Sequence, residues 1–393
     1  MTCLSFTVRG VRVAIVAECF TPTWNGVTGS VLRILDYFER SGHDAMVIAP
    51  GPGPLRSGAA SVVRVPALTL PAYRSLPIGL PTAGVRKALE AFGPDVVHLA
   101  APVVLGDAGG LAAARLGIPV VAVYQTDLAG FARRYGLDQV GLGQVAGRAI
   151  WAWLRRVHGR ADLTLAPSSL AEWDLRRHDI APVARWARGV DTSRFHPRHR
   201  NPVLRRRLLG PGGAVLVGYA GRLAREKQVH QLEVLSGVPG VRVVIIGDGP
   251  ARGRLERQLP GASFLGYQTG VALSEAVASL DVFVHPGSHE TFCQAVQEAM
   301  AAGVPVVAPA AGGPLDLVQH GVTGWLYPAG EPAVLREAVA ALAGDAAMRA
   351  RMGAAARATV HDRSWGRLGD QLLGYYRQVA GTRAGDAGVD RAA

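Results

Sequence analysis

Two series of short apolar runs, rich in Val, Ile and Leu, constrain the fold of this 393-residue chain more than any other feature. Segments with helical spacing of apolar residues alternate with these runs, which predicts parallel sheets with helices packed on both faces. The runs lie at 11–18, 44–50, 95–100, 119–124 and 163–167, and then again at 214–223, 241–250, 279–286 and 303–309. Because the series restarts, the sequence predicts an α/β protein with two doubly wound domains.

The polar and Pro-rich segment 189–202, "GVDTSRFHPRHRNP", separates the two series and is the predicted interdomain linker. The predicted domains are therefore 1–188 and 203–364. The Gly- and Ala-rich tail 381–393 is predicted to be disordered. Doubly wound sheets bind ligands outside the carboxyl ends of their strands, so we expect function in loops that follow strands.

The formal charge of +12 is uneven along the chain: residues 148–207 hold fourteen Arg against five acidic residues. Such a segment could meet phosphate or an anionic membrane surface, or it could simply solvate helix faces. No apolar run approaches the roughly 18 residues that suggest a membrane span, and we expect a cytoplasmic protein. Cys3, Cys19 and Cys293 are odd in number and form no CxxC pair, which predicts neither a disulfide framework nor a zinc site.

Two loops that follow strands carry groups suited to phosphate. In "AGRLAREK" (220–227), Arg222 and Lys227 suit a diphosphate, since each hydrogen bond to a charged group contributes about 1.5–3 kcal/mol. In "FTPTWNGVTGSV" (20–31), Gly26 would let backbone N–H groups approach an anion at a helix N-terminus. Each loop also has a plain structural interpretation, as a solvated helix start or a turn shaped by glycine.

The loop "IIGDGPARG" (245–253) lacks the spacing of a dinucleotide fingerprint, because its last Gly comes one residue too late. The first domain carries no GxGxxG after its opening strand either. A nicotinamide-dependent enzyme is therefore disfavoured, and we interpret the loop as structural.

The stretch "HPGSHETFCQAVQEAMAAG" (285–303) places Glu290 and Glu298 eight positions apart at the start of a predicted helix. One carboxylate could accept hydrogen bonds from a bound sugar and the other from a ribose, while free amides near residues 291–293 face negative charge. A ligand with two polyol rings joined by a diphosphate matches this pattern. A further glycine loop, 310–317, is expected beside it.

These motifs together resemble a known family. The combination of Asn25-Gly26, Arg222, Lys227 and two glutamates with seven residues between them resembles glycosyltransferase family 4, the retaining GT-B enzymes that use nucleotide sugars. Three segments, "PTWNGVTGSVLR", "VYQTDLAGFARRYG" and "HETFCQAVQEAM", resemble the actinobacterial GDP-mannose-dependent α-mannosyltransferases that act on lipid acceptors. The resemblance implies a GT-B fold, in which two Rossmann-like domains face each other across a cleft. It assigns the acceptor to the first domain and the nucleotide sugar to the second, and it implies that a C-terminal helix, 365–380, packs back on the first.

The resemblance also implies roles for single residues. It places Gly26, Arg222 and Lys227 on the diphosphate, Glu298 on the ribose and Glu290 on the transferred sugar. The remaining implied donor contacts are Asn25, Tyr267 in a segment that wraps the nucleobase, Thr291, Phe292, Cys293, Gly313 and Pro314. Glu290, Arg222, Lys227 and Asp127 are the catalytic candidates.

The chain departs from the family at two positions. Cys293 stands where the family often has Gly, and Gln125 stands where it often has His. The loss of that His leaves Thr126 and Asp127 beside Gln125 in the acceptor region, and Asp127 has no firmly assigned step.

The reaction expected is transfer of a hexose, mannose from GDP-mannose, to a hydroxyl of a glycolipid or other glycoside, with retention and an α-linkage. No DxD motif occurs, so no metal cofactor is expected and the cations would replace it. No carboxylate nucleophile is evident either, so retention would rest on front-face attack.

Two alternatives stay open. One is a GT-B enzyme that uses a UDP-sugar, or a sugar-nucleotide epimerase. The other is a basic protein without catalysis that binds a membrane or nucleic acid, prompted by Trp151 and Trp153 among the arginines of 149–162. An anionic membrane surface at the inner face of the cell membrane is retained as a candidate partner, and nucleic acid is not expected to be one.

Overall fold

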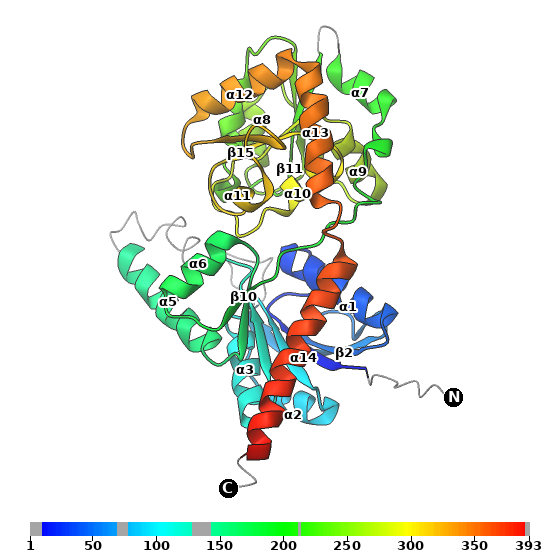
Figure 1. The fold of residues 1–393 in the computed structure, drawn as a ribbon. Coiled ribbons are helices and arrows are strands. Elements are labelled where there is room, and N and C mark those ends of the chain that lie inside the picture. Colours follow the sequence, from blue (N-terminus) through cyan, green and yellow to red (C-terminus); the bar gives the residue numbers. More distant parts are fainter. Residues whose placement is uncertain (1–9, 69–77, 128–142, 211–213, 390–393) are drawn as a thin grey trace, which may run out of the picture. The chain divides into compact units, whose positions relative to one another are not determined.

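A computed structural model describes residues 10–68, 78–127, 143–210 and 214–389 of the chain. The described residues divide into two compact α/β units (Figure 1). Unit 1 comprises the chain up to Pro167, Ala171–Ala187 and the residues from Leu368 onward, and unit 2 comprises Ser168–Leu170 and Arg188–Arg367. Within these ranges, no helix combines the length and the apolarity that a bilayer crossing needs.

Unit 1 is built on an eight-stranded sheet in the order β10-β9-β8-β7-β1-β2-β4-β3. Every neighbouring pair is parallel except β3 and β4. The strands are β1 (Arg12–Ala17), β2 (Asp44–Pro50), β3 (Arg56–Ser57), β4 (Ala60–Val65), β7 (Val96–Ala100), β8 (Val120–Val123), β9 (Leu163–Ala166) and β10 (Val183–Arg185). A separate hairpin pairs β5 (Ala67–Leu68) with β6 (Ile78–Gly79).

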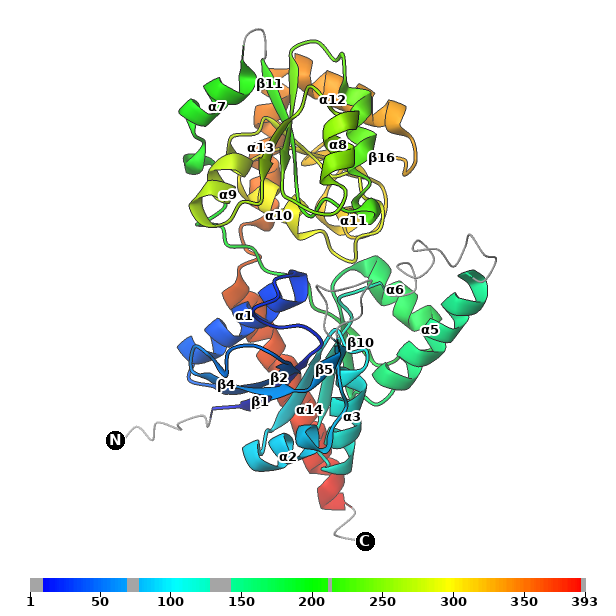
Figure 2. The same cartoon turned by 180° about the vertical axis from the view of Figure 1, so that it is seen from behind.

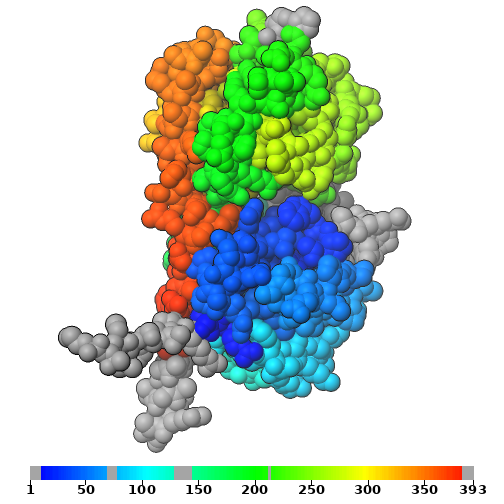
Figure 3. Space-filling view, turned by 90° about the vertical axis from the view of Figure 1, so that its right-hand side faces the viewer, coloured from blue at the N-terminus to red at the C-terminus, as the bar shows by residue number. Residues whose placement is uncertain are grey.

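The helices of unit 1 cover both faces of this sheet, because the central strands are apolar on both sides (Figures 1 and 2). On β1, Val13 and Ile15 pack against α1 (Gly26–Arg40) and α14 (Trp365–Val389). Ala14 and Val16 of the same strand pack against α2 (Ala83–Phe92) and α3 (Leu105–Arg115). The remaining helices are α5 (Gly143–His158) and α6 (Ser169–Arg177). In the space-filling view, the early part of the chain, coloured blue to cyan, forms the visible face of unit 1 (Figure 3).

Unit 2 is built on a six-stranded parallel sheet in the order β13-β12-β11-β14-β15-β16. Its strands are β11 (Val215–Ala220), β12 (Val241–Ile246), β13 (Ser263–Gly266), β14 (Val282–Val284), β15 (Val306–Pro309) and β16 (Gly324–Tyr327). Its helices are α7 (Pro202–Leu209), α8 (Arg252–Gln258), α9 (Gly270–Ala278), α10 (Gln294–Ala301), α11 (Pro314–Leu317), α12 (Pro332–Gly344) and α13 (Ala346–Val360), with 3₁₀ segments at Pro197–His199, Arg225–Lys227 and Val229–Leu235.

The strand order of unit 2 reverses between β11 and β14, which are hydrogen-bonded neighbours although β12 and β13 come between them in the sequence. In parallel α/β sheets, such a switch point leaves a crevice at the carboxyl ends of the two strands, where ligands bind. The loops that follow β11 and β14 are those in which the sequence places Arg222, Lys227 and Glu290. The predicted α/β class with two doubly wound sheets is confirmed.

Helix α14 is longer than the sequence suggests. It continues to Val389, through residues for which a disordered tail from residue 381 is predicted. The physical reason is that residues added to the end of a formed helix avoid the cost of nucleation, although the three glycines of this stretch are poor helix formers.

A buried hydrogen bond fastens α14 to the sheet of unit 1. The hydroxyl of Tyr376 lies 2.7 Å from Nδ1 of His98, and both side chains are fully buried. Burial lowers the pKa of His98 to about 3, so the ring is neutral at physiological pH. The indole N–H of Trp186 donates a second buried hydrogen bond to the carbonyl oxygen of Leu368, at 2.9 Å.

We predict that Tyr376→Phe lowers the free energy of unfolding by about 1–3 kcal/mol, because it leaves a buried ring nitrogen of His98 without its partner. Tyr375→Phe is the matched control: its hydroxyl donates to the carbonyl oxygen of Arg185 at an exposed position, where water can replace it. Denaturant titration measures both variants. An equal cost for the two substitutions would contradict the role given to the buried bond.

Candidate active site

An ion pair joins the loops that follow β11 and β14 in unit 2. Oε1 of Glu290 lies 2.5 Å from Nζ of Lys227 and 3.1 Å from Nε2 of His285. The Glu290 side chain is 14% exposed and that of Lys227 is 26% exposed, so the pair is largely screened from water but still open on one side. The structure therefore brings together two of the residues that the sequence predicts for the donor site.

The pair sets the charge state of the site. Burial alone would raise the pKa of Glu290, but the Lys227 ammonium and the His285 ring outweigh it and hold that pKa at about 2. Burial likewise lowers the pKa of Lys227, but the Glu290 carboxylate outweighs this and raises it above its usual value. Both groups are charged at neutral pH, and each compensates the other's desolvation.

A second contact holds the same two loops together. The side-chain oxygen of Gln228 accepts hydrogen bonds from the backbone N–H and the hydroxyl of Ser288, at 3.1 and 3.2 Å. Gln228 itself has a left-handed backbone, with φ of 51°, directly after the 3₁₀ segment that carries Lys227. The position of Lys227 beside Glu290 is thus fixed by backbone geometry as well as by charge.

The predicted glycine loop lies against the backbone of residues 290–292. The N–H of Gly313 donates to the carbonyl oxygen of Glu290 at 2.7 Å. A Cβ on Gly313 would lie 2.1 Å from the carbonyl oxygen of Phe292, and one on Gly312 would lie 2.5 Å from that of Glu290. Only glycine permits this approach, and it puts Pro314, the first residue of α11, next to the Glu290 segment.

The loop after β12 packs against the backbone on both sides of Arg222. A Cβ on Gly247 would lie 1.9 Å from the carbonyl oxygen of Gly221, and the N–H of Leu223 donates to the carbonyl oxygen of Asp248 at 2.9 Å. These contacts agree with the structural interpretation of this loop. Arg222 is exposed at the end of β11.

The other predicted donor residues of unit 2 lie around α10 and β13. Phe292 and Cys293 have buried side chains, so only their backbone can meet a ligand from solvent without rearrangement. Thr291 and Glu298 are half-buried, the latter in the second turn of α10. Tyr267 follows β13 and is 63% exposed.

The sequence did not single out Arg188, whose position in a segment next to the predicted linker gave no functional signal. Arg188 is partly buried, and burial lowers the pKa of its guanidinium to about 10, while Glu298 and Glu290 act in the opposite direction. The side-chain amides of Gln297 and Gln294 donate to the carbonyl oxygens of Arg188 and Gly189, at 2.9 and 3.0 Å. Arg188 thus places a partly buried positive charge close enough to interact with the two glutamates. The one signal available was a lone basic residue in the apolar run "WARGV".

In unit 1, Asn25 and Gly26 form the start of α1. The side-chain oxygen of Asn25 accepts from the N–H of Thr28 at 2.9 Å, so Asn25 is the N-cap and Gly26 is the first helical residue. The Thr28 hydroxyl donates to the carbonyl oxygen of Thr23 at 3.0 Å and closes the turn. This local structure agrees with the predicted strand-to-helix turn, and a donor contact at Asn25 and Gly26 stays a prediction.

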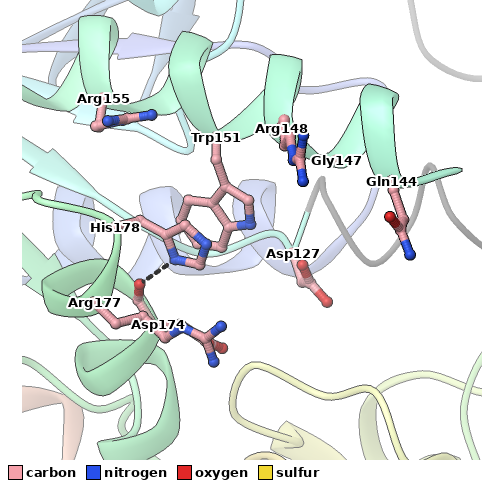
Figure 4. A pocket seen from close by; sticks show the side chains of 9 residues that line it. All are labelled: Asp127, Gln144, Gly147, Arg148, Trp151, Arg155, Asp174, Arg177 and His178. Atoms are coloured by element: carbon pink, nitrogen blue, oxygen red, sulfur yellow. Dashed lines mark hydrogen bonds between the residues drawn. The ribbon is translucent and has the colours of Figure 1, made fainter.

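A pocket of about 450 Å³ opens in unit 1 beside the predicted acceptor region (Figure 4). Its floor is a stack of Trp151 from α5 on His178, with ring centroids 3.7 Å apart and planes within 4°. Asp127 lines this pocket, while Gln125 is half-buried and Thr126 is exposed in the same segment after β8. The full lining is Asp127, Gln144, Gly147, Arg148, Trp151, Arg155, Asp174, Arg177 and His178.

Comparison with solved structures defines the fold. The sucrose-phosphate synthase of Thermosynechococcus elongatus matches with a TM-score of 0.77 and 19% identity, covering 95% of this chain and 100% of that one. Two doubly wound parallel sheets in this arrangement along the chain are the GT-B fold of glycosyltransferases.

The family follows from sequence comparison. Residues 24–194 match the family described as Glycosyltransferase Family 4, and residues 202–359 match Glycosyl transferases group 1. A GDP-mannose-dependent alpha-mannosyltransferase of Mycobacterium tuberculosis is 50% identical, over 96% of this chain and 99% of its own length. A protein of the same description from Corynebacterium glutamicum is 45% identical, over 95% of this chain and 90% of its own length. The chain belongs to glycosyltransferase family 4, and the predicted resemblance is confirmed.

We predict a specific loss of stability in acid from the Glu290 pair. Because the folded-state pKa of about 2 lies below the usual 4.5, the carboxylate contributes stability that is present above pH 4.5 and is lost as the pH falls toward 2. Glu290→Gln lacks this contribution. One pKa unit corresponds to about 1.4 kcal/mol, so the native protein should lose at least about 1 kcal/mol more than the variant between about pH 6 and pH 3.

Denaturant titrations of both proteins across this range measure the difference. Glu256→Gln is the control, since Glu256 pairs with Arg252 at the surface with a side chain 44% exposed and should leave the pH profile nearly unchanged. Parallel curves for the native protein and Glu290→Gln would contradict the strong coupling of Glu290 to Lys227.

Proposed function

We propose that this chain is a retaining α-mannosyltransferase that moves mannose from GDP-mannose to a hydroxyl of a glycolipid or other glycoside. The proposal is supported by the actinobacterial relatives that carry this description at 45–50% identity along nearly the whole chain. The observation that carries it is the charged Lys227–Glu290 pair at the switch point of unit 2. A carboxylate that stays ionised can accept hydrogen bonds from sugar hydroxyls, and the cation beside it can meet phosphate.

In this proposal, different residues of unit 2 contact different parts of the donor. Glu290 accepts hydrogen bonds from the mannose hydroxyls, and Glu298 accepts from the ribose. Arg222 and Lys227 meet the diphosphate, so that Lys227 exchanges part of its contact with Glu290 for a phosphate oxygen. Gly313 and Pro314 lie beside the sugar and the phosphate, and the backbone around Tyr267 meets the base.

The proposed catalytic effect is electrostatic. Negative charge grows on the diphosphate as the bond to the anomeric carbon breaks, and fixed cations stabilise that charge without reorganising. The sequence has no DxD motif to hold a metal for this purpose. The acceptor hydroxyl attacks from the face that the diphosphate leaves, and a phosphate oxygen takes its proton, which gives retention.

The pocket of unit 1 is the proposed acceptor site. The flat face of the Trp151–His178 stack suits the C–H face of a sugar ring, and the polar groups around it, Asp127 and Arg148 among them, suit its hydroxyls. Trp153 and Arg156 lie on the same helix, α5, with the guanidinium 5.7 Å from the indole ring centre. A basic helix with aromatic residues suits peripheral contact with an anionic membrane, where a lipid acceptor would be found.

We predict that GDP-mannose raises the melting temperature of the protein more than any UDP- or ADP-sugar does. A ligand at about 100 times its Kd stabilises by about 2.7 kcal/mol, which a thermal shift panel detects readily. Mannose transfer to a lipid fraction, with the product's anomeric configuration read by NMR, completes the test. Preference for a UDP-sugar, or conversion of the donor sugar without acceptor, would favour the alternative enzymes, and nucleic-acid binding without nucleotide-sugar binding would favour the non-catalytic one.

Glu290→Ala is the discriminating variant in the same assay, with Glu256→Ala as the surface control. Loss of the carboxylate should lower transfer at saturating donor by at least about a hundredfold, a size usual for one well-placed polar group in a transition state. Unchanged transfer by Glu290→Ala at saturating GDP-mannose would overturn the role of Glu290.

A further inference from the structure

Three side chains with metal-binding atoms meet at the carboxyl end of β14. An imidazole nitrogen of His285, a carboxylate oxygen of Glu290 and the Sγ atom of Cys293 all lie within 4.8 Å of one another. Zinc binds such ligands at about 2.0–2.3 Å in a tetrahedral arrangement, which separates the ligand atoms by roughly 3.5 Å. Rotations that close the group by about 1 Å would therefore suffice. A thiolate, an imidazole and a carboxylate together select a thiophilic divalent ion over Mg²⁺ or Ca²⁺.

The buried imidazole of His285 is the feature that indicates a ligand. Its side chain is 3% exposed and its ring stacks on Tyr219, with ring centroids 5.9 Å apart. Among the residues that the structure describes, Nδ1 of His285 has no hydrogen-bond partner, and Nε2 lies 3.1 Å from Oε1 of Glu290. An unpaired buried polar group costs about 1–3 kcal/mol, and a bond to a metal ion would remove that cost.

Cys293 places its thiol in this group, and its backbone is strained there. Its φ of 72° lies in the left-handed region, which glycine adopts freely and other residues adopt at about 1–2 kcal/mol. A cysteine thiol ordinarily carries its proton at neutral pH, whereas a metal ion binds the thiolate. Binding would therefore exchange one proton for one ion: the S–H bond breaks, a sulfur–metal bond forms and the proton goes to solvent.

The position of Lys227 determines how a bound ion would affect donor binding. Its ammonium already lies 2.5 Å from Glu290, so a divalent ion bound to the same carboxylate must displace it. The ion would then occupy the carboxylate that is proposed to hold the mannose hydroxyls and would push the cation away from its place beside the diphosphate. The ion and the donor exclude each other.

We propose that Cys293, His285 and Glu290 form a binding site for a thiophilic divalent ion, with Zn²⁺ as its probe, and that the bound ion inhibits transfer by competing with the donor. The binding site stands on the geometry of unit 2 alone. The competition rests on the proposed function of Glu290.

Binding is tested on the full-length protein without an affinity tag. Titration calorimetry with ZnCl₂ should show one site and the release of one proton per ion, seen as a dependence of the heat on the buffer. Co²⁺ should give a thiolate-to-cobalt charge-transfer band in the near ultraviolet, because sulfur is a ligand. Cys293→Ser should remove the band and weaken zinc binding at least tenfold, His285→Gln should also weaken binding, and Cys19→Ser, at the other buried cysteine, should leave both unchanged.

Thermal denaturation confirms that each variant is folded before it is compared. If Co²⁺ gives the native protein no such band, or if Cys293→Ser binds zinc as tightly as the native protein, the site is refuted. Neither result requires that the protein binds a nucleotide-sugar donor.

Competition is tested by donor kinetics at fixed concentrations of Zn²⁺. The KM for GDP-mannose should rise in proportion to Zn²⁺ while kcat at saturating donor stays constant, and EDTA should reverse the effect. Zinc that binds through Cys293 without changing the donor KM would overturn the competition. Failure of GDP-mannose to bind at all would overturn the proposed function instead, and the cobalt band would still decide whether the site exists.

Discussion

The ion pair between Lys227 and Glu290 is the interaction on which the rest of the candidate active site depends. It joins the carboxyl ends of two neighbouring strands whose loops are 63 residues apart in the sequence. Breaking it from either side would leave one charge largely buried without its partner, which is strongly destabilising. The contact of Ser288 with Gln228 joins the same two loops, and Gly313, in the loop after β15, holds the backbone of Glu290.

The same pair explains how the site can carry charge and still select a ligand with hydroxyl groups. A carboxylate that is desolvated and ionised is an acceptor for hydroxyl groups, and the ammonium beside it is already oriented before any ligand arrives. Arg222 adds a second, exposed cation at the end of β11. Arg188 adds a third cation, partly buried, that interacts with Glu298. In the proposed function, a departing diphosphate would lie near these three cations.

Much of the fold could be predicted from the sequence because its central strands are buried on both faces and are therefore continuous apolar runs. The predicted strand at 44–50 coincides with β2, and that at 11–18 contains β1. Short strands such as β10 and β13 were missed, since three or four partly exposed residues make no such run. The glutamate spacing and the cationic loop predicted Glu290 and Lys227, which the structure brings together in the candidate site. Which side chains would pair could not be predicted, because neither the contact of Lys227 with Glu290 nor the burial of Arg188 leaves a trace in local spacing.

Charge stabilisation of a departing diphosphate by Arg222 and Lys227 is tested most directly by the binding of GDP and GMP to the native protein and to Arg222→Gln, measured by titration calorimetry. GDP should bind the native protein at least about tenfold more tightly than GMP, a gain of about 1.4 kcal/mol from the second phosphate. Most of that gain should disappear in Arg222→Gln while GMP affinity is kept. An unchanged ratio of GDP to GMP affinity in the variant would contradict this role for the cation.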